Sequence, residues 1–300
     1  MNASAIFHTF PDGSRTSFGG DEYIFVEIAV EMSLEAALRV QAIAARIAEL
    51  EIPGIVDIAP ANTSYMIRLD PDVVHPRDVL VAVSEVHDHD DGSDPRIMTQ
   101  IVEVPVYYDD PWTKDVCLRF RAGHQSPSET DIEFVARING FGSVRDLIDA
   151  HTAAPFIVTF PCFKPGNAES YQLVARDRQI EAPKYLSPRT ETPARAVAHG
   201  GAFSVIYPVS GVGGYQLLGR AAVPVVDLYR RSREFKASRV LTPISTLIQF
   251  RPIDRAEYDE IRYEVESDHY VFKRQPVEFS LKKFMAEPYE YAQSLKELVS

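Results

Sequence analysis

The residues of this chain with the clearest capacity for chemistry lie between positions 184 and 207. Arg189 carries a planar, permanently charged guanidinium group that can clamp a carboxylate through two parallel hydrogen bonds. Lys184 can bind the same group less directionally, and Ser204 and Tyr207 offer hydroxyl groups. Such residues suit a site that binds a small carboxylate and stabilises negative charge as it develops in a reaction.

Each of these residues also has an ordinary structural explanation. Arginine is usually a surface residue, and a tyrosine before a proline, as in Tyr207-Pro208, is more often part of a packed core. The glycine pairs at 200–201 and 213–214 would let a ligand or a partner backbone come close, but paired glycines are most often turns. The residues therefore indicate a binding site only as a group.

Other kinds of chemistry have little support in the sequence. There is no Gly-x-Ser-x-Gly nucleophile motif, no phosphate loop and no dinucleotide fingerprint that opens a helix. The run His87-Asp88-His89-Asp90-Asp91 mixes metal-binding side chains, but it precedes Gly92-Ser93-Asp94-Pro95, so we interpret it as a solvated linker and predict no metal site. The two cysteines, Cys117 and Cys162, are expected to be reduced thiols.

Composition excludes several kinds of partner. The formal net charge of −12 argues against binding to nucleic acid, which requires clustered Lys and Arg. No apolar run approaches the roughly 20 residues that span a bilayer, and the first residues lack the pattern of a signal peptide. We therefore expect a cytoplasmic protein without nucleic-acid or membrane partners.

Residues 1–95 are predicted to form a small α+β domain. Strand-like runs at 23–28, 54–59 and 64–69 alternate with two helical patterns. The first helix has Ser33 as its N-cap, with Leu50 the last residue of its apolar face, and Pro76 lies in the first turn of the second.

Residues 96–253 are predicted to form a mainly-β barrel. After an entry strand at 101–108 and two short helices that begin near Ser126 and Ser143, short apolar runs separated by Pro and Gly continue to residue 253, including one at 223–228. The segment 108–130 looks like a loop insertion that carries Trp112 and His124, without a readable role. Residues 254–300 form a C-terminal extension with a helix at 255–262, a strand at 270–272 and a last helix near 288–299.

A set of short motifs in the second half resembles a known family. The motifs are Cys162-Phe163-Lys164-Pro165-Gly166-Asn167, Ser187-Pro188-Arg189, Gly201 to Pro208 and Gly213-Gly214-Tyr215-Gln216-Leu217-Leu218-Gly219-Arg220. In order and spacing they resemble the carboxyltransferase domain of the allophanate hydrolase subunit 1 type, found in urea carboxylase, in the B component of bacterial 5-oxoprolinase and in a sporulation-kinase inhibitor. The resemblance implies an α+β N-terminal subdomain followed by a cyclophilin-like barrel.

Residue chemistry and the resemblance together select the candidate site. The catalytic candidates are His151, Lys184, Arg189 and Tyr207, and the substrate- or cofactor-binding candidates are Lys164, Gly201, Phe203, Ser204, Gly213, Gly214, Tyr215 and Arg220. The sequence departs from the family pattern where Phe203 replaces a glutamine, Asn167 a phenylalanine, Tyr215 a tryptophan and Arg195 a glycine. These departures indicate either a changed substrate or a subunit that has lost part of its chemistry.

The resemblance implies a role inside a larger assembly. The leading hypothesis is subunit 1 of a heteromeric biotin-dependent carboxyltransferase that acts with a sister subunit 2 on a small urea- or amide-like acceptor. Biotin and ATP would be carried by partner chains, a biotin carrier and a biotin carboxylase, because no Met-Lys-Met biotinylation motif and no ATP-grasp region are found here. The alternatives are a 5-oxoprolinase-type subunit for ATP-dependent opening of a lactam ring, and a non-catalytic interaction protein like the kinase inhibitor.

Overall fold

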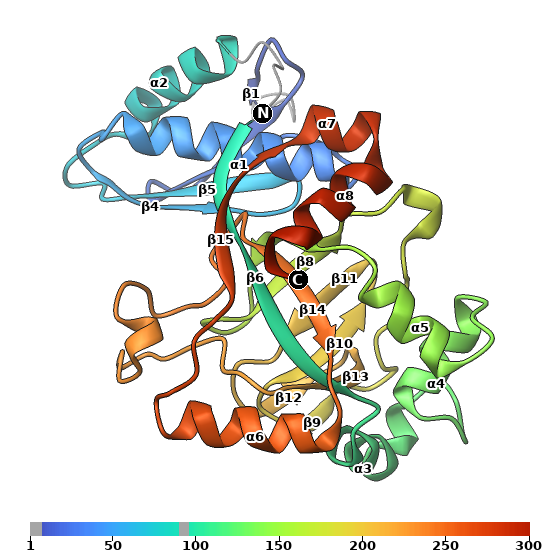
Figure 1. Cartoon of the computed structure of the whole chain (residues 1–300). Helices are drawn as coiled ribbons and strands as arrows, with labels where there is room; N and C mark the ends of the chain where they lie inside the picture. The colour runs from blue at the N-terminus through green and yellow to red at the C-terminus, as the bar shows by residue number, and fades with distance from the viewer. Residues whose placement is uncertain (1–7, 90–95) are drawn as a thin grey trace. The chain divides into compact units, whose positions relative to one another are not determined.

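The chain folds into two compact units, with the division between Arg96 and Ile97. The structure is a computed structural model that describes residues 8–89 and 96–300. Figure 1 shows the order of the helices and strands along the chain. Within the described residues, no helix is both long enough and apolar enough to cross a membrane.

The first unit is an antiparallel sheet with two helices on one face (Figure 1). Its strand order is β1-β2-β3-β5-β4, and its core is built from alternate residues of β3 and β5, such as Ile24 and Ile67. The elements are β1 (His8–Thr9), β2 (Arg15–Gly19), β3 (Tyr23–Glu27), α1 (Leu34–Glu49), β4 (Ile55–Pro60), β5 (Ser64–Leu69) and α2 (Pro76–Asp88).

Local sequence signals set the limits of the two helices. The Ser33 hydroxyl accepts a hydrogen bond from the backbone N–H of Ala36, as an N-cap does, and Pro76 is the first residue of α2. Leu50 is half exposed rather than part of the buried face, because α1 ends at Glu49 and Leu50 is its C-cap.

The sequence had suggested that His87 belongs to a solvated linker, and this prediction was wrong. It lies in the last turn of α2 and is buried, with Nδ1 2.7 Å from Asp12 Oδ2 and Nε2 2.8 Å from the Tyr65 hydroxyl. Its ring stacks on Phe10 with 4.3 Å between centroids. Because these partners come from distant segments, spacing along the chain gave no sign of them. Asp90 and Asp91 of that run, and residues 92–95 that follow it, lie outside the described residues.

The second unit contains a closed barrel of seven strands, which confirms the expected fold class. The strand order β13-β10-β11-β8-β7-β14-β6 closes through pairing of β13 with β6, and β15 adds to the outer edge of β6. Closure depends on Gly219, where a Cβ atom would lie 2.6 Å from the carbonyl oxygen of Tyr107. The strands are β6 (Arg96–Tyr108), β7 (Phe156–Pro161), β8 (Ala168–Gln172), β10 (Ala196–Gly200), β11 (Phe203–Ile206), β13 (Gln216–Ala221), β14 (Leu247–Pro252) and β15 (Arg274–Ser280).

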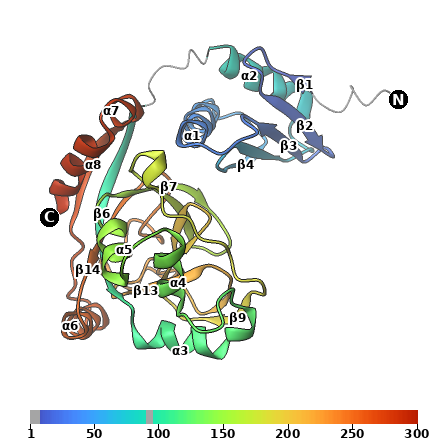
Figure 2. The same ribbon diagram turned by 90° about the vertical axis from the view of Figure 1, so that its right-hand side faces the viewer.

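A two-stranded ribbon and several helices surround the barrel. The ribbon pairs β9 (Arg189–Thr192) with β12 (Gly211–Gly213). Figure 2 shows helices distributed around the outside of the strands. They are α3 (Pro111–Arg119), α4 (Asp131–Ile138), α5 (Val144–His151), α6 (Arg255–Glu266), α7 (Leu281–Ala286) and α8 (Pro288–Lys296).

Three local predictions in this unit were wrong. The first short helix begins after Thr130, which forms a capping box with Glu133, because the hydroxyl of Ser126 instead caps the N–H of Glu129 in a turn. The run 223–228 contributes only an isolated bridge from Val226 to Val240. The last strand is Arg274–Ser280 rather than 270–272, where Phe272 packs into the core as irregular chain.

Candidate functional site

A cavity of about 400 Å³ beside the barrel brings together five of the sequence-predicted residues. They are Lys184, Tyr207, Gly213, Gly214 and Tyr215. The other lining residues are Cys162, Phe163, Asn167, Glu169, Tyr185, Pro188, Val205 and Val212. The lining therefore comes from the turn between β7 and β8, from β8 itself, from the segment that leads into β9, from β11 with its end, and from β12 with the residues that follow it.

The turn between β7 and β8 supplies one wall. It is tight because Lys164 N–H donates to the carbonyl of Cys162 at 2.8 Å, while Gly166 has a φ of +86° and its backbone packs against Val226, leaving no room for a Cβ atom. Asn167 donates to the carbonyl of Ile206 at 3.3 Å, which fixes the turn to β11. Burial raises the pKa of Cys162 to about 11, so its sulfur is a neutral thiol and not a nucleophilic thiolate.

Tyr215 also lines the cavity. Its hydroxyl donates a 2.5 Å hydrogen bond to Glu169 Oε1, and Lys184 Nζ lies 5.1 Å from the centre of its ring. Burial and then the neighbouring Glu169 raise the pKa of Tyr215, so it remains a phenol. A side chain at Gly200 would collide with the Tyr215 ring, which explains the glycine there. The cavity thus presents a cation, a carboxylate and a hydroxyl group close to one another.

Tyr207 and Gly213 lie next to each other in the cavity lining. A Cβ atom on Gly213 would lie 2.7 Å from the Tyr207 hydroxyl and 2.6 Å from Thr192 Oγ1. The Tyr207 hydroxyl is also 3.4 Å from the backbone N–H of Tyr215, which donates to it. Burial raises the pKa of Tyr207, whereas the nearby Arg189 lowers it in part, so the hydroxyl is a hydrogen-bond donor at neutral pH.

Arg189 is completely buried behind the cavity wall and does not line the cavity. Its guanidinium carbon lies 4.3 Å from the centre of the Tyr185 ring, and Nη1 lies 3.7 Å from Asp131 Oδ2. Asp131 also accepts hydrogen bonds from the Tyr185 hydroxyl at 2.5 Å and from the Leu217 N–H at 2.7 Å. Within residues 8–89 and 96–300, Nη1 and Nη2 of Arg189 have no hydrogen-bond acceptor. Arg189 can therefore act on a ligand through its charge and through Tyr185 and Tyr207, rather than as a direct clamp.

His151 and Ser204 lie in the barrel interior, away from the cavity. His151 Nδ1 is 2.8 Å from the Tyr108 hydroxyl and Nε2 is 3.2 Å from Ser204 Oγ, and both residues are fully buried. Burial, followed by the neighbouring His199, lowers the pKa of His151 well below its usual value, so the ring is neutral. This arrangement fixes the barrel core and gives no contact with the cavity.

The remaining predicted residues are dispersed. Phe203 is buried against Tyr171, Gly201 occupies the β10–β11 turn with a φ of +60°, and Lys164 Nζ lies 3.4 Å from the carbonyl of Ser210. Arg220 packs on Trp112, which lies in helix α3 rather than in a loop, whereas residues 120–130 of that segment are irregular apart from one 3-10 turn. Conversely, Glu169 and Tyr185 line the cavity although sequence reasoning missed them. Only the position of Tyr185 directly after Lys184 could have pointed to it.

Cys117, His124 and Asp131 are a group in the described chain whose ligand atoms lie within 4.8 Å of one another. They do not fit a metal ion. Gln216 directs its Oε1 to His124 Nε2 at 3.1 Å, because its amide nitrogen donates to the carbonyl of Pro183, so Nε2 carries a proton and has no lone pair. Burial raises the pKa of Cys117 to about 12, and Arg189 already neutralises Asp131.

A second, larger cavity of about 900 Å³ lies between the segment after β8 and helix α8. Its lining includes the apolar residues Ala150, Ala154 and Leu173, and it contains none of the sequence-predicted site residues. The smaller cavity is therefore the candidate site.

Comparison with known proteins defines the class of this barrel. The family model for the carboxyltransferase domain, subdomain C and D, matches residues 14–235. The chain therefore belongs to the carboxyltransferase domain family, as the sequence motifs indicated. Among curated proteins it is 30% identical over 215 residues to the B component of 5-oxoprolinase from Bacillus subtilis, a match that covers 67% of this chain and 79% of that protein.

Longer relatives match over more of this chain. Urea amidolyase of Lachancea kluyveri is 26% identical over 295 residues, which is 93% of this chain but 15% of that protein. The crystal structure of Kluyveromyces lactis urea amidolyase superposes with a TM-score of 0.80 at 22% identity, over 95% of this chain and 17% of that one. The chain thus spans a small part of the urea amidolyases that it resembles. At 22% identity, this structural match supports the fold alone.

Proposed function

We propose that this chain is subunit 1 of a heteromeric, biotin-dependent carboxyltransferase that acts with a sister subunit on a small urea- or amide-like acceptor. The observation that carries the proposal is the convergence of Lys184, Glu169, Tyr207 and Tyr215 on one cavity in a barrel of this family. Biotin and ATP would belong to partner chains, and biotin would supply the activated carboxyl group.

The chemistry of the cavity suits such an acceptor. Carboxyl transfer to nitrogen requires donors for an oxygen that gains negative charge and an acceptor for the proton that leaves nitrogen. The Tyr207 hydroxyl is available as a hydrogen-bond donor. The positive charge of the buried Arg189 lowers the pKa of Tyr207 in part and so makes its hydroxyl a stronger donor. Lys184 would attract the carboxylate, and Glu169 would accept the N–H of a urea or amide.

The share of this chain that each relative matches favours the urea amidolyase type over the 5-oxoprolinase type. Matches to urea amidolyases cover up to 93% of the chain, whereas the match to the 5-oxoprolinase component covers 67%. A match over 93% of the chain extends beyond residues 14–235, the region that the family model matches.

A 5-oxoprolinase-type subunit for ATP-dependent lactam opening is the second candidate. It is favoured by the 30% identity to the B component of 5-oxoprolinase from Bacillus subtilis, a match that covers 79% of that protein. A lactam also presents an N–H and a carbonyl oxygen, the groups that Glu169 and Tyr207 can bind.

The decisive experiment is purification of the chain with its native partners, followed by ATP-dependent turnover assays with urea, simple amides and 5-oxoproline. The leading proposal predicts a biotinylated partner, turnover of a urea or amide, and inhibition by avidin. Turnover of 5-oxoproline that avidin leaves unchanged would establish the second candidate. Turnover by the isolated chain would contradict both proposals, because each assigns ATP binding to partner chains.

A further inference from the structure

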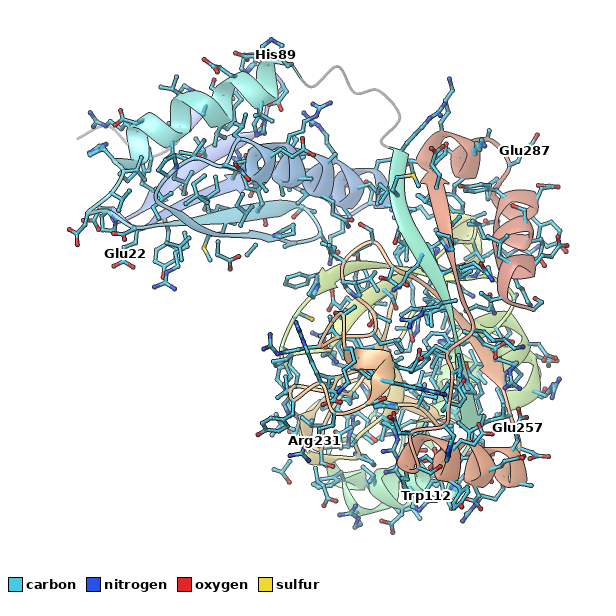
Figure 3. The ribbon with its side chains drawn as sticks, turned by 60° about the vertical axis from the view of Figure 1, so that its left-hand side comes forward. Glu22, His89, Trp112, Arg231, Glu257 and Glu287 are labelled. Atoms are coloured by element: carbon cyan, nitrogen blue, oxygen red, sulfur yellow. The ribbon has the colours of Figure 1, made fainter. Side chains whose placement is uncertain are left out.

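Arg220 lies outside the cavity, among several arginines around the single tryptophan of the chain. Its guanidinium carbon is 5.0 Å from the centre of the Trp112 ring, and that of Arg255 is 4.9 Å from the same ring. Tyr258 of α6 packs beside Trp112 with 5.3 Å between ring centres. In Figure 3 the labelled residues Trp112 on α3 and Glu257 on α6 show where these side chains lie in the second unit.

Arg195 joins the cluster at the cost of backbone strain. It occupies the third position of a turn in which Ala196 N–H donates to the Pro193 carbonyl at 3.2 Å, and its φ is +66°. Glycine is the residue that adopts this conformation without strain. The side chain is held in place, with Nε donating to the Ala221 carbonyl at 3.2 Å and Nη2 to the Tyr258 hydroxyl at 3.2 Å.

Backbone carbonyls hold the other two guanidinium groups nearby. Arg220 Nε donates to the Ala194 carbonyl at 3.1 Å, and Arg262 Nη1 donates to the Ala222 carbonyl at 3.0 Å. Since Ala221 and Ala222 are neighbours and β10 pairs with β13, Arg195, Arg220 and Arg262 lie together. Burial, together with the charges of Arg195 and Arg262, lowers the pKa of Arg220.

The acidic residues near these arginines do not saturate them. Asp110 already accepts hydrogen bonds from the Trp112 and Thr113 N–H groups and from the Thr113 hydroxyl. Glu266, the ion-pair partner of Arg262, is 69% exposed, so that pair is weak. In the described part of the chain, Nη1 and Nη2 of Arg220 have no hydrogen-bond acceptor.

We propose that Arg195, Arg220 and Arg262 form a binding site for an oxyanion, a phosphate or carboxylate group. Forked guanidinium groups match both anions in shape and charge. In a chain of net charge −12, a like-charged cluster held together at a strained residue is unexpected unless an anion stabilises it. The site is independent of the cavity and of the function proposed for it.

Trp112 provides a direct readout, because it is the single tryptophan and contacts Arg220. Inorganic phosphate and acetate would be titrated into the full chain at constant ionic strength while tryptophan fluorescence is recorded. We expect a saturable change with at least one anion, and binding about tenfold weaker in Arg220→Gln and in Arg262→Gln. Arg220→Lys keeps the charge but loses the forked guanidinium group. Its affinity for the anion should lie between those of the unmodified chain and Arg220→Gln.

Arg231→Gln is the matched control. Arg231 also stacks on an aromatic ring, that of Tyr229 at 4.8 Å, but it is exposed and lies on the loop after β13 (Figure 3). Its loss should leave the response unchanged. The inference fails if sodium chloride gives the same change, if neither anion gives a saturable change, or if both Arg220→Gln and Arg262→Gln respond like the unmodified chain.

The source of the anion can be distinguished in the same assay. If the native partner chains abolish the phosphate response, an acidic group of a partner occupies the site. If the response persists in the complex, the site serves a free small anion.

Discussion

The hydroxyl group of Tyr215 donates a 2.5 Å hydrogen bond to Glu169 Oε1, which links the residue before β13 to β8 inside the cavity. Burial raises the pKa of Tyr215, so the tyrosine is the donor and Glu169 the acceptor. The pair fixes the direction of a carboxylate that can bind an N–H group of a ligand.

Removal of this hydroxyl should impair function more than folding. We expect Tyr215→Phe to lower turnover of the partner complex by about tenfold, because Glu169 loses its orientation. The free energy of unfolding should change by only about 1 kcal/mol, the usual net value of one hydrogen bond. Tyr289→Phe, at an exposed position outside this cavity, is the control. Unchanged turnover in Tyr215→Phe would remove Glu169 from the proposed site.

Two adjacent glycines should respond differently to substitution. Gly213→Ala should destabilise the chain by about 1–3 kcal/mol, because the new methyl group would collide with Thr192 Oγ1 and the Tyr207 hydroxyl. Gly214→Ala should be tolerated, since the nearest atom, Lys184 Cβ, would be 4.0 Å away. Urea denaturation of both variants measures the difference. Equal stability of the two variants would show that the residues around Gly213 can move to accommodate the methyl group.

The buried pair of Asp131 and Arg189 should be essential for stability. Asp131→Asn leaves the fully buried Arg189 without its counter-charge, so we expect a loss of about 3–5 kcal/mol in chemical denaturation. The exposed pair of Asp149 and Arg145 provides the comparison, and Asp149→Asn should cost less than about 1 kcal/mol. A similar small effect in both variants would contradict the assigned role of Asp131.

The first unit should lose stability in acid through Asp12. Burial alone raises the pKa of this carboxyl group, but hydrogen bonds from Ser14 and His87 outweigh it and lower the pKa from 3.8 to about 2. The folded state therefore binds the proton less tightly than the unfolded state, so this stabilisation is complete above pH 3.8 and is lost as the pH falls toward 2.

Thermal unfolding as a function of pH tests this directly. Asp12→Asn should be less stable than the unmodified chain at neutral pH, and its stability should fall less between pH 3.8 and about 2. Asp72→Asn, at an exposed position, should follow the unmodified chain. Parallel pH profiles for Asp12→Asn and the unmodified chain would show that another group controls the acid response.

Local signals in the sequence predicted much of the fold. Ser33, Pro76 and Ser143 begin helices where expected, because capping depends on residues three or four positions apart. The strand at 270–272 and the run at 223–228 were wrong, because an apolar segment can pack against a core without pairing in a sheet. The prediction that His87 lies in a linker was wrong for a related reason, because its partners Asp12 and Tyr65 are distant from it in sequence.

The sequence by itself determined the family, the barrel and the residue types available for chemistry, because motifs, caps and apolar periodicity are local properties of the chain. Only the tertiary structure decided which of these residues share a site. The tertiary fold brings Lys184, Tyr207 and Tyr215 to one cavity and places His151 and Ser204 in the core. It buries Arg189 against Asp131 and separates Arg220 from both. Side-chain direction depends on strand pairing across the barrel, and pairing between distant segments is not encoded in local spacing.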